Sequence, residues 1–76
     1  MNKQYDKIIG QNIRAIRIKQ KLSQEELSVH LQVRGCDITR SALAKIEVGQ
    51  RHLYPDELLL LKEILCVSFD EIFYGI

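Results

Sequence analysis

Residues 22–49 contain the strongest local signals in the chain and read LSQEELSVHLQVRGCDITRSALAKIEVG. A helix is expected to begin at Ser23, because a serine hydroxyl accepts hydrogen bonds from the free amides of the following turn. Glu26, three residues later, can accept a hydrogen bond from the serine amide and complete a capping box. Gly35 suits a helix end, since glycine tolerates the left-handed backbone conformation. These signals predict a helix over about 23–34.

A second helix is predicted in the same stretch, over about 39–48. Thr39 can cap its first turn, and Gly49 can end it. Leu43 and Ile46 are spaced so that they lie on one face, which we expect to face the core. The two predicted helices are therefore consecutive and joined by a short turn.

Three further helices are predicted on either side of this pair. Before it, Ile9, Ile13 and Ile16 repeat with helical spacing. After it, Pro55 fits the first turn of a helix because its missing amide is not needed there, and Ser68 can cap a last helix. No stretch alternates apolar and polar residues as a half-buried strand does. The sequence therefore predicts an all-α fold, a compact five-helix bundle in one domain over 1–76, with helices at about 5–21, 23–34, 39–48, 55–66 and 69–74.

The composition is that of a globular protein. Hydrophobic residues make up 46% of the chain and charged residues 28%, which argues against disorder. The longest apolar run, at 58–61, is far shorter than the roughly 20 residues that a membrane span needs. The first residues lack the apolar stretch of a signal peptide. We therefore expect a cytoplasmic protein that is not associated with a membrane.

Charge is distributed unevenly along the chain, although the net charge is only +1. Residues 1–52 contain ten Lys or Arg and five acidic residues, which gives +5. Residues 53–76 contain one Lys and five acidic residues, which gives −4. A basic N-terminal part and an acidic C-terminal part would orient the molecule on a polyanion. Uneven solvated faces on a small protein would look the same, so charge alone does not decide the function.

The predicted helix at 39–48 has a polar outer face. With its apolar residues facing inward, Arg40, Ser41 and Lys45 are left outward, as is Ala44. Arg and Lys can donate to guanine O6 and N7 in the major groove, and a Ser hydroxyl can donate or accept. Two helices joined by a tight turn are also the geometry that places a helix in that groove. A merely solvated face would contain similar residues, so this pattern leaves both interpretations open.

Short sequence motifs in this region resemble those of a known family. The motifs LSQEEL at 22–27 and SALAKIEVG at 41–49 resemble those of the phage-repressor and Cro-like (XRE-type) helix-turn-helix family. Further matching positions are Arg17, Gly49, Arg51, Pro55 and the ending at 65–73. The resemblance covers about residues 9–73. It implies a lambda-repressor-like fold and a sequence-specific DNA-binding transcriptional regulator, acting as a repressor, without a cofactor.

The resemblance also implies which residues meet double-stranded DNA. Gln24 matches a glutamine that touches the DNA backbone and supports the reading helix, and Arg51 matches a basic residue near the phosphates. Positions at the start of the third helix match residues that meet bases or nearby phosphates. The residues implied to bind DNA are Gln24, Thr39, Arg40, Ser41, Lys45 and Arg51.

Arg17 and Glu47 match an arginine–glutamate pair that joins the first helix to the third in this family. Two unrelated surface charges would give the same sequence pattern, so the pair is an expectation. If the pair is partly buried, removal of one partner should be strongly destabilising, because the other charge is left without a partner.

One departure from the family pattern concerns the turn between the two DNA-binding helices. Family members usually have a shorter connection, and about five extra residues fall around 32–37 in this chain. We expect residues 32–34 to lengthen the second helix by most of a turn and residues 35–38 to form a wider connection. The reach of the third helix into a groove depends on this segment.

No catalytic or metal-binding arrangement is apparent in the sequence. His30 and His52 have no further ligand at metal-binding spacing. Cys36 and Cys66 do not form a Cys-x-x-Cys pair, so both are expected to be reduced thiols, with Cys66 in the core. We therefore predict a protein that is not an enzyme and has no catalytic residue, metal site, cofactor or small-molecule substrate.

The C-terminal third contains more apolar residues than one small core can take. Four successive leucines at 58–61 cannot all face inward, because successive helical residues turn by about 100°. Leu58 and Leu61 are expected inside, which leaves another leucine at the surface. The candidate homodimer patch consists of Leu59, Leu60, Tyr74 and Ile76. Such a patch would set the spacing of two DNA half-sites, whereas scattered surface apolar residues are the alternative.

Two functions from different classes remain open at this point. One is a sequence-specific regulator that binds double-stranded DNA and reads the major groove with the helix at 39–48. The other is a protein-interaction module, or an antitoxin-like partner, that binds a protein through the apolar C-terminal helices. Salt-dependent binding of the purified protein to duplex DNA distinguishes the two.

Overall fold

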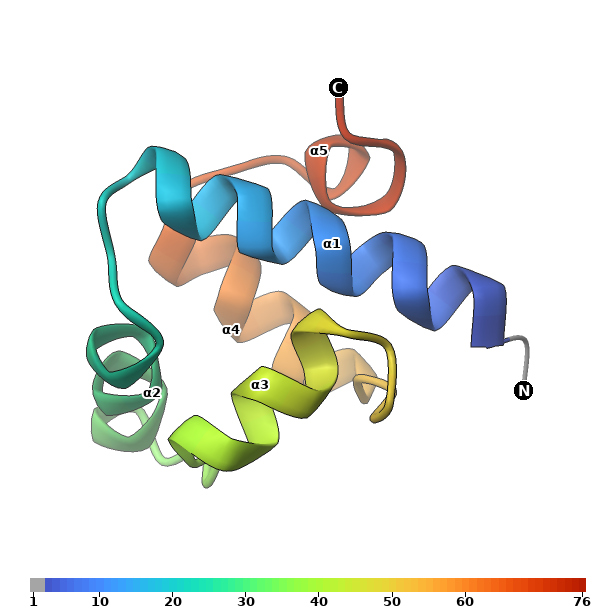
Figure 1. The fold of residues 1–76 in the computed structure, drawn as a ribbon. Helices are drawn as coiled ribbons and strands as arrows, with labels where there is room; N and C mark the ends of the chain where they lie inside the picture. The colour runs from blue at the N-terminus through green and yellow to red at the C-terminus, as the bar shows by residue number, and fades with distance from the viewer. Residues whose placement is uncertain (1–2) are drawn as a thin grey trace.

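A computed structural model describes residues 3–76 and contains five helices and no strand in that range (Figure 1). The helices are α1 (Lys3–Lys19), α2 (Gln24–Val33), α3 (Arg40–Glu47), α4 (Pro55–Leu65) and α5 (Phe69–Tyr74). The prediction of an all-α fold with five helices is confirmed. The bounds of the last four helices agree with the predicted ranges to within one residue at each end.

The bounds of α1 differ from the expected range of about 5–21. The helix begins at Lys3, and Lys21 has a left-handed φ of 61°, which a right-handed helix does not contain. The amide of Leu22 then donates to the carbonyl of Arg17 at 3.1 Å and closes the helix end. Glycine is the usual residue at such a position, so a lysine there gives no sequence signal for the end of the helix.

The two helices of the central pair begin with the expected side-chain caps. The amide of Glu26 donates to Ser23 Oγ at 3.0 Å, and the amide of Ser23 donates to Glu26 Oε1 at 2.9 Å. At the start of α3 the amide of Ala42 donates to Thr39 Oγ1 at 3.2 Å. These bonds satisfy amides that have no partner within their own helix, so the local sequence determines where both helices begin.

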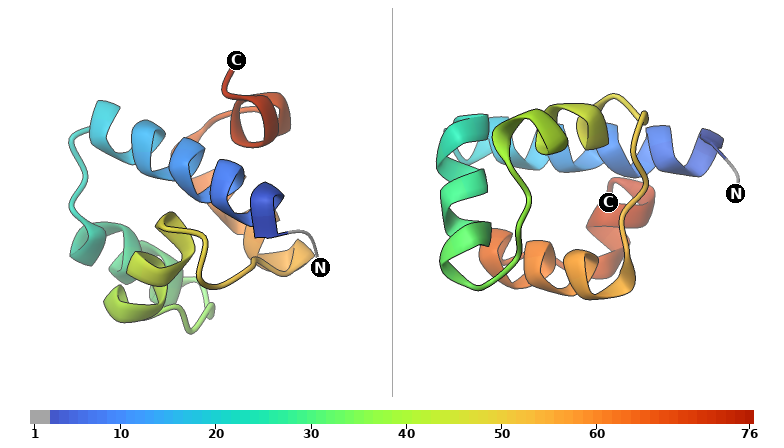
Figure 2. Two further views of the ribbon diagram at one scale, coloured as in Figure 1. Left: turned by 45° about the vertical axis from the view of Figure 1, so that its right-hand side comes forward. Right: turned by 90° about the horizontal axis from the view of Figure 1, so that it is seen from below.

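The first helix, α1, lies between α3 on one side and α5 on the other, and α2 and α4 complete the bundle (Figures 1 and 2). Gly10 on α1 lies directly against the backbone of Ile46 and Glu47, where no side chain would fit. This close approach holds α1 against the C-terminal end of α3. The fully buried apolar residues come from all five helices and the α2–α3 connection: Ile13, Leu27, Leu31, Ile38, Leu43, Ile46, Leu61, Leu65 and Ile72.

One residue expected inside the core is placed differently. Leu58 is partly buried and packs against the core on the inward side of α4, as predicted, whereas Cys66 is exposed, so the core assignment of Cys66 is wrong. Cys66 is the residue after α4 and has a left-handed φ of 56°, which takes it out of the helical pattern that buries Leu61 and Leu65. The buried stripe of α4 therefore ends one residue earlier than its periodicity suggests.

Candidate nucleic-acid interface

The connection between α2 and α3, residues 34–39, is anchored in the core. Ile38 is fully buried, and the amide of Cys36 donates to the carbonyl of Leu31 at 2.9 Å. The second helix ends at Val33, one residue before the expected Arg34, which caps it, and residues 34–39 form the connection to α3. Because the wide turn is held at both ends, α3 has a defined position relative to α2.

Polar side chains gather on the outer face of α3. Arg40, Ser41 and Lys45 are exposed, whereas Leu43 and Ile46 are buried. Within residues 3–76, neither Arg40 nor Lys45 forms a salt bridge. Both cations are therefore available to an anionic ligand, and the exposed hydroxyl of Ser41 lies on the same helix between them.

A buried hydrogen-bond network holds α3 on its inner side. Arg17 Nε and Nη2 donate to the carboxylate of Glu47 at 2.7 and 3.0 Å, and Glu47 is only 2% exposed. Gln24 Nε2 donates to the same carboxylate at 3.0 Å, and Arg17 Nη1 donates to the carbonyl of Leu22 at 2.8 Å. Hydrogen bonding to Glu47 raises the pKa of Arg17 above its ordinary value. The network joins α1, the start of α2 and the end of α3.

Arg51 lies in the α3–α4 connection and has a carboxylate partner that the sequence pattern does not indicate. Its Nη1 and Nη2 donate to the two carboxylate oxygens of Glu57, both at 3.0 Å, and Nη1 also donates to the carbonyl of His52 at 3.2 Å. The guanidinium also lies 5.9 Å from the ring centroid of Tyr54. Hydrogen bonding to Glu57 raises the pKa of Arg51, whose side chain keeps 30% of its surface exposed.

Thr39 and Val48 cap α3, directly before and directly after the helix. Thr39 is exposed, and its hydroxyl oxygen is already engaged in the cap of α3. Val48 follows the helix and is 56% exposed. It lies three residues after Lys45 and seven after Ser41, so helical spacing places it on the outer face as well. That spacing is sufficient to place Val48 on the outer face from the sequence alone. Nothing in the sequence, by contrast, pairs Arg51 with Glu57 across the loop.

The four residues of the candidate homodimer patch lie on α4 and at the end of α5. Leu59 is 47% exposed, whereas Leu60 is partly buried and packs against the core. Tyr74 and Ile76 are 71% and 80% exposed. The expectation that one of the successive leucines is left at the surface is therefore met by Leu59.

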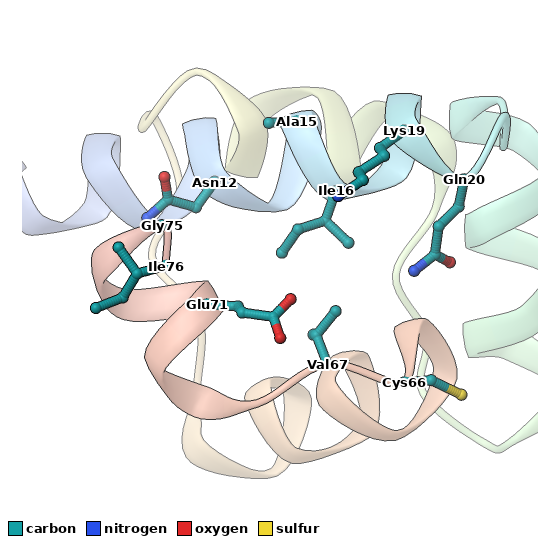
Figure 3. Close-up of a pocket in the computed structure, with 10 residues that line it drawn as sticks. All are labelled: Asn12, Ala15, Ile16, Lys19, Gln20, Cys66, Val67, Glu71, Gly75 and Ile76. Carbon is teal, nitrogen blue, oxygen red and sulfur yellow. The ribbon is translucent and has the colours of Figure 1, made fainter.

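A cleft lies between α1 and the segment that contains the end of α4 and α5 (Figure 3). Two side-chain amides, one on α1 and one directly after its end, cross it at either end. Asn12 Nδ2 donates to the carbonyl of Ile72 at 2.8 Å, and Gln20 Nε2 donates to the carbonyl of Leu65 at 2.6 Å. Lys19 also lines this cleft, on the side of α1 that faces α5 (Figure 3).

Residues 3–76 contain no group of three His, Cys, Asp or Glu that could hold a metal ion. Burial raises the pKa of the Cys36 thiol, which disfavours its reactive thiolate form. In the same part of the chain, no helix combines the length and the apolar character that crossing a membrane requires.

Comparison with known proteins identifies the family to which this arrangement belongs. A helix-turn-helix family model matches residues 13–72, a range that contains α2, α3 and the Arg17–Glu47 pair. The crystal structure of the DNA-binding domain of BldD is similar over 96% of this chain and 99% of that chain, with a TM-score of 0.80 and 27% sequence identity. No curated protein matches the chain. The chain belongs to the XRE-type helix-turn-helix family of DNA-binding transcription regulators.

Proposed function

We propose that this chain is a cytoplasmic, sequence-specific repressor that occupies a promoter and places α3 in the major groove of double-stranded DNA. The observation that supports the proposal most directly is the outer face of α3. Two cations that form no salt bridge among the described residues, and a hydroxyl, are presented there on a helix whose inner side is held by the buried carboxylate of Glu47. The related solved structure is a DNA-binding domain, which supports the same mode of action.

Discrimination between sequences comes from Arg40, Ser41 and Lys45. Arg40 and Lys45 can donate to guanine O6 and N7, and Ser41 can contact a base edge or a phosphate. These side chains leave the same short helix, so a single docked position presents all three to neighbouring base pairs. We therefore expect binding sites that contain guanine at the positions opposite Arg40 and Lys45.

Affinity that is independent of sequence comes from Gln24, Thr39 and Arg51. Gln24 lies at the start of α2 and Thr39 at the start of α3, where helix N-termini favour phosphate groups. Arg51 can contact a phosphate while it is held by Glu57, because 30% of its side-chain surface is exposed. These contacts would position α3 in the groove without distinguishing one base from another.

Selection from a pool of random duplexes tests this proposal. The purified chain is expected to enrich a short motif, and Arg40→Ala should lose preference at one position of that motif. Lys19→Ala serves as the matched control, because it also removes an exposed cation, but at a position that lines the cleft beside α5 instead of the outer face of α3. Recovery of unchanged random sequence after repeated rounds would contradict sequence-specific recognition.

We also propose that the chain binds DNA as a homodimer through Leu59, Leu60, Tyr74 and Ile76. A symmetric dimer would require a palindromic motif with a fixed half-site spacing. Sedimentation at high micromolar concentration should show a species of twice 8.8 kDa, and the double variant Leu59→Ser, Tyr74→Ser should shift it toward 8.8 kDa. A wild-type sample that contains only the 8.8 kDa species would contradict the dimer.

The second candidate function is a protein-interaction module or antitoxin-like partner. The exposure of Tyr74 and Ile76 near the C-terminal end favours this alternative, because apolar groups in contact with solvent are typical of partner-binding surfaces. Under this alternative, the chain would bind duplex DNA weakly and with the same affinity for every sequence. The pool selection therefore distinguishes it from the proposed repressor.

A further inference from the structure

The N-terminal half of α1 lies immediately beside the segment that follows α3. Gly49, just after α3, packs so closely on Lys7 that an added Cβ would lie 2.8 Å from the Cα of Lys7 and 2.9 Å from its Cβ. Figure 2 shows the α3–α4 connection passing this part of α1. The side chain of Lys7 therefore begins next to the C-terminal end of the proposed reading helix.

Arg14 lies on the same side of α1, two turns further along. It follows Gly10 by four residues, and Gly10 is the residue that touches the backbone of α3. Lys7 and Arg14 are both exposed, and within residues 3–76 neither forms a salt bridge. Arg17, by contrast, is buried with Glu47 and is not available to a ligand.

We infer that Lys7 and Arg14 both contact DNA phosphates, so that the DNA interface includes α1 as well as α2 and α3. This inference rests on the proposed function. An α-helix is about 10–12 Å across and the major groove is about 12 Å wide, so an inserted α3 has phosphates directly on either side of it. Cations beside α3 on a neighbouring helix then face the phosphate backbone rather than the bases.

The spacing of the two residues fits one DNA strand. Seven residues of α-helix rise by about 10 Å, which equals the axial length of about three nucleotides at 3.4 Å per nucleotide. Lys7 and Arg14 can therefore contact different phosphates of the same strand. Such contacts add affinity for any sequence and release counterions, so their signature is the salt dependence of binding rather than the sequence preference.

Lys19 provides a matched control on the same helix. It is an exposed cation within residues 3–76 that forms no salt bridge, and it lines the cleft on the α5 side of α1 (Figure 3). Lys19→Gln removes the same charge as Lys7→Gln or Arg14→Gln, but at a position that faces away from α3. Any effect of net charge alone should be equal in the three variants.

Fluorescence anisotropy with one duplex at several salt concentrations tests the inference. The slope of log Kd against log salt should fall in magnitude by about 0.9 in Lys7→Gln and in Arg14→Gln, and by about 1.8 in the double variant. The reason is that fewer counterions are released on binding when a phosphate contact is lost. Lys19→Gln should keep the wild-type slope. The thermal midpoint of each variant, followed by circular dichroism, verifies that the helices are retained.

Three outcomes would overturn the inference. An unchanged slope in Lys7→Gln or in Arg14→Gln would show that this residue meets no phosphate. An equal decrease in Lys19→Gln would assign the effect to net charge. Failure of the wild-type chain to bind any duplex would overturn the proposed function and this inference together, whereas the first two outcomes leave wild-type binding, and thus the proposed function, intact.

Discussion

The carboxylate of Glu47, buried at the end of α3, accepts two hydrogen bonds from the guanidinium of Arg17 on α1, at 2.7 and 3.0 Å. The bidentate geometry uses both carboxylate oxygens, and Gln24 donates to one of them as well. One side chain of α3 is thereby held from two other helices. The orientation of the outer face of α3 follows from this arrangement.

We expect Glu47→Ala to lower the free energy of unfolding by roughly 3–5 kcal/mol, because Arg17 would be left as an unpaired buried charge. Arg17→Ala should be similarly destabilising. The double variant should lose less than the sum of the two single losses, since the charges are removed together. Urea denaturation of the four proteins measures these differences. A strictly additive double variant would show that the two charges do not interact.

Gly10→Ala should destabilise the protein by about 3 kcal/mol, because the new methyl group would collide with the backbone of α3 at Ile46 and force α1 away from it. Gly35→Ala is the matched control. Gly35 has open space around it but a φ of 82°, so its substitution should cost only the roughly 1–2 kcal/mol of a left-handed alanine. Thermal unfolding compares the two variants. A Gly10→Ala protein as stable as Gly35→Ala would contradict the close packing of α1 on α3.

Glu57 should make stability depend on pH in the acid range. Hydrogen bonding by Arg51 lowers the pKa of Glu57, with a further contribution from the amide of Tyr54 and against the opposing effect of burial. Its stabilising contribution is therefore present above the unfolded-state pKa of about 4.3 and is lost as the pH falls through the lower folded-state pKa.

The thermal midpoint between pH 7 and pH 3 measures this effect. Below about pH 4.3 the midpoint of the wild type should fall more steeply than that of Glu57→Gln, which has no carboxylate to protonate at this position. The other acidic residues are common to both proteins, so they do not alter the comparison. Parallel curves for the two proteins would rule out a stabilising Arg51–Glu57 pair.

Arg40→Ala and Arg51→Ala should affect DNA binding in different ways. Loss of Arg40 should remove about 1–3 kcal/mol of discrimination at one base pair, because a base-reading contact is lost. Loss of Arg51 should weaken binding to all sequences alike, and it should also lower the thermal midpoint, since Glu57 loses its partner. Dissociation constants for the selected site and its single-base variants measure both effects. Unchanged discrimination by Arg40→Ala would argue against base recognition by this residue.

The sequence was sufficient to predict the helices because their limits are determined by local chemistry. Ser23 and Thr39 form caps with amides only three residues away, and Pro55 begins α4 at a position that needs no amide donor. Apolar residues at helical spacing then identify the buried faces. All of these signals act over one or two turns, so they can be recognised without a three-dimensional structure.

Features that depend on exceptional backbone or on distant contacts could not be predicted in the same way. Lys21 and Cys66 adopt left-handed conformations that are rarely taken by residues with side chains, and for this reason the sequence predicts neither the end of α1 nor the exposure of Cys66. Arg51 and Glu57 are six residues apart across a loop, without helical spacing. The approach of Gly49 to Lys7 joins segments that only the folded chain brings together.

The ratio of two dissociation constants, for the selected duplex and for a scrambled duplex of the same composition, tests the proposed sequence-specific recognition most directly. Fluorescence anisotropy at about 0.15 M salt should give a selected site that binds at least about 10³-fold more tightly, as expected for specific recognition by α3. Equal affinity for the two duplexes at that salt concentration would contradict a sequence-reading role for the outer face of α3.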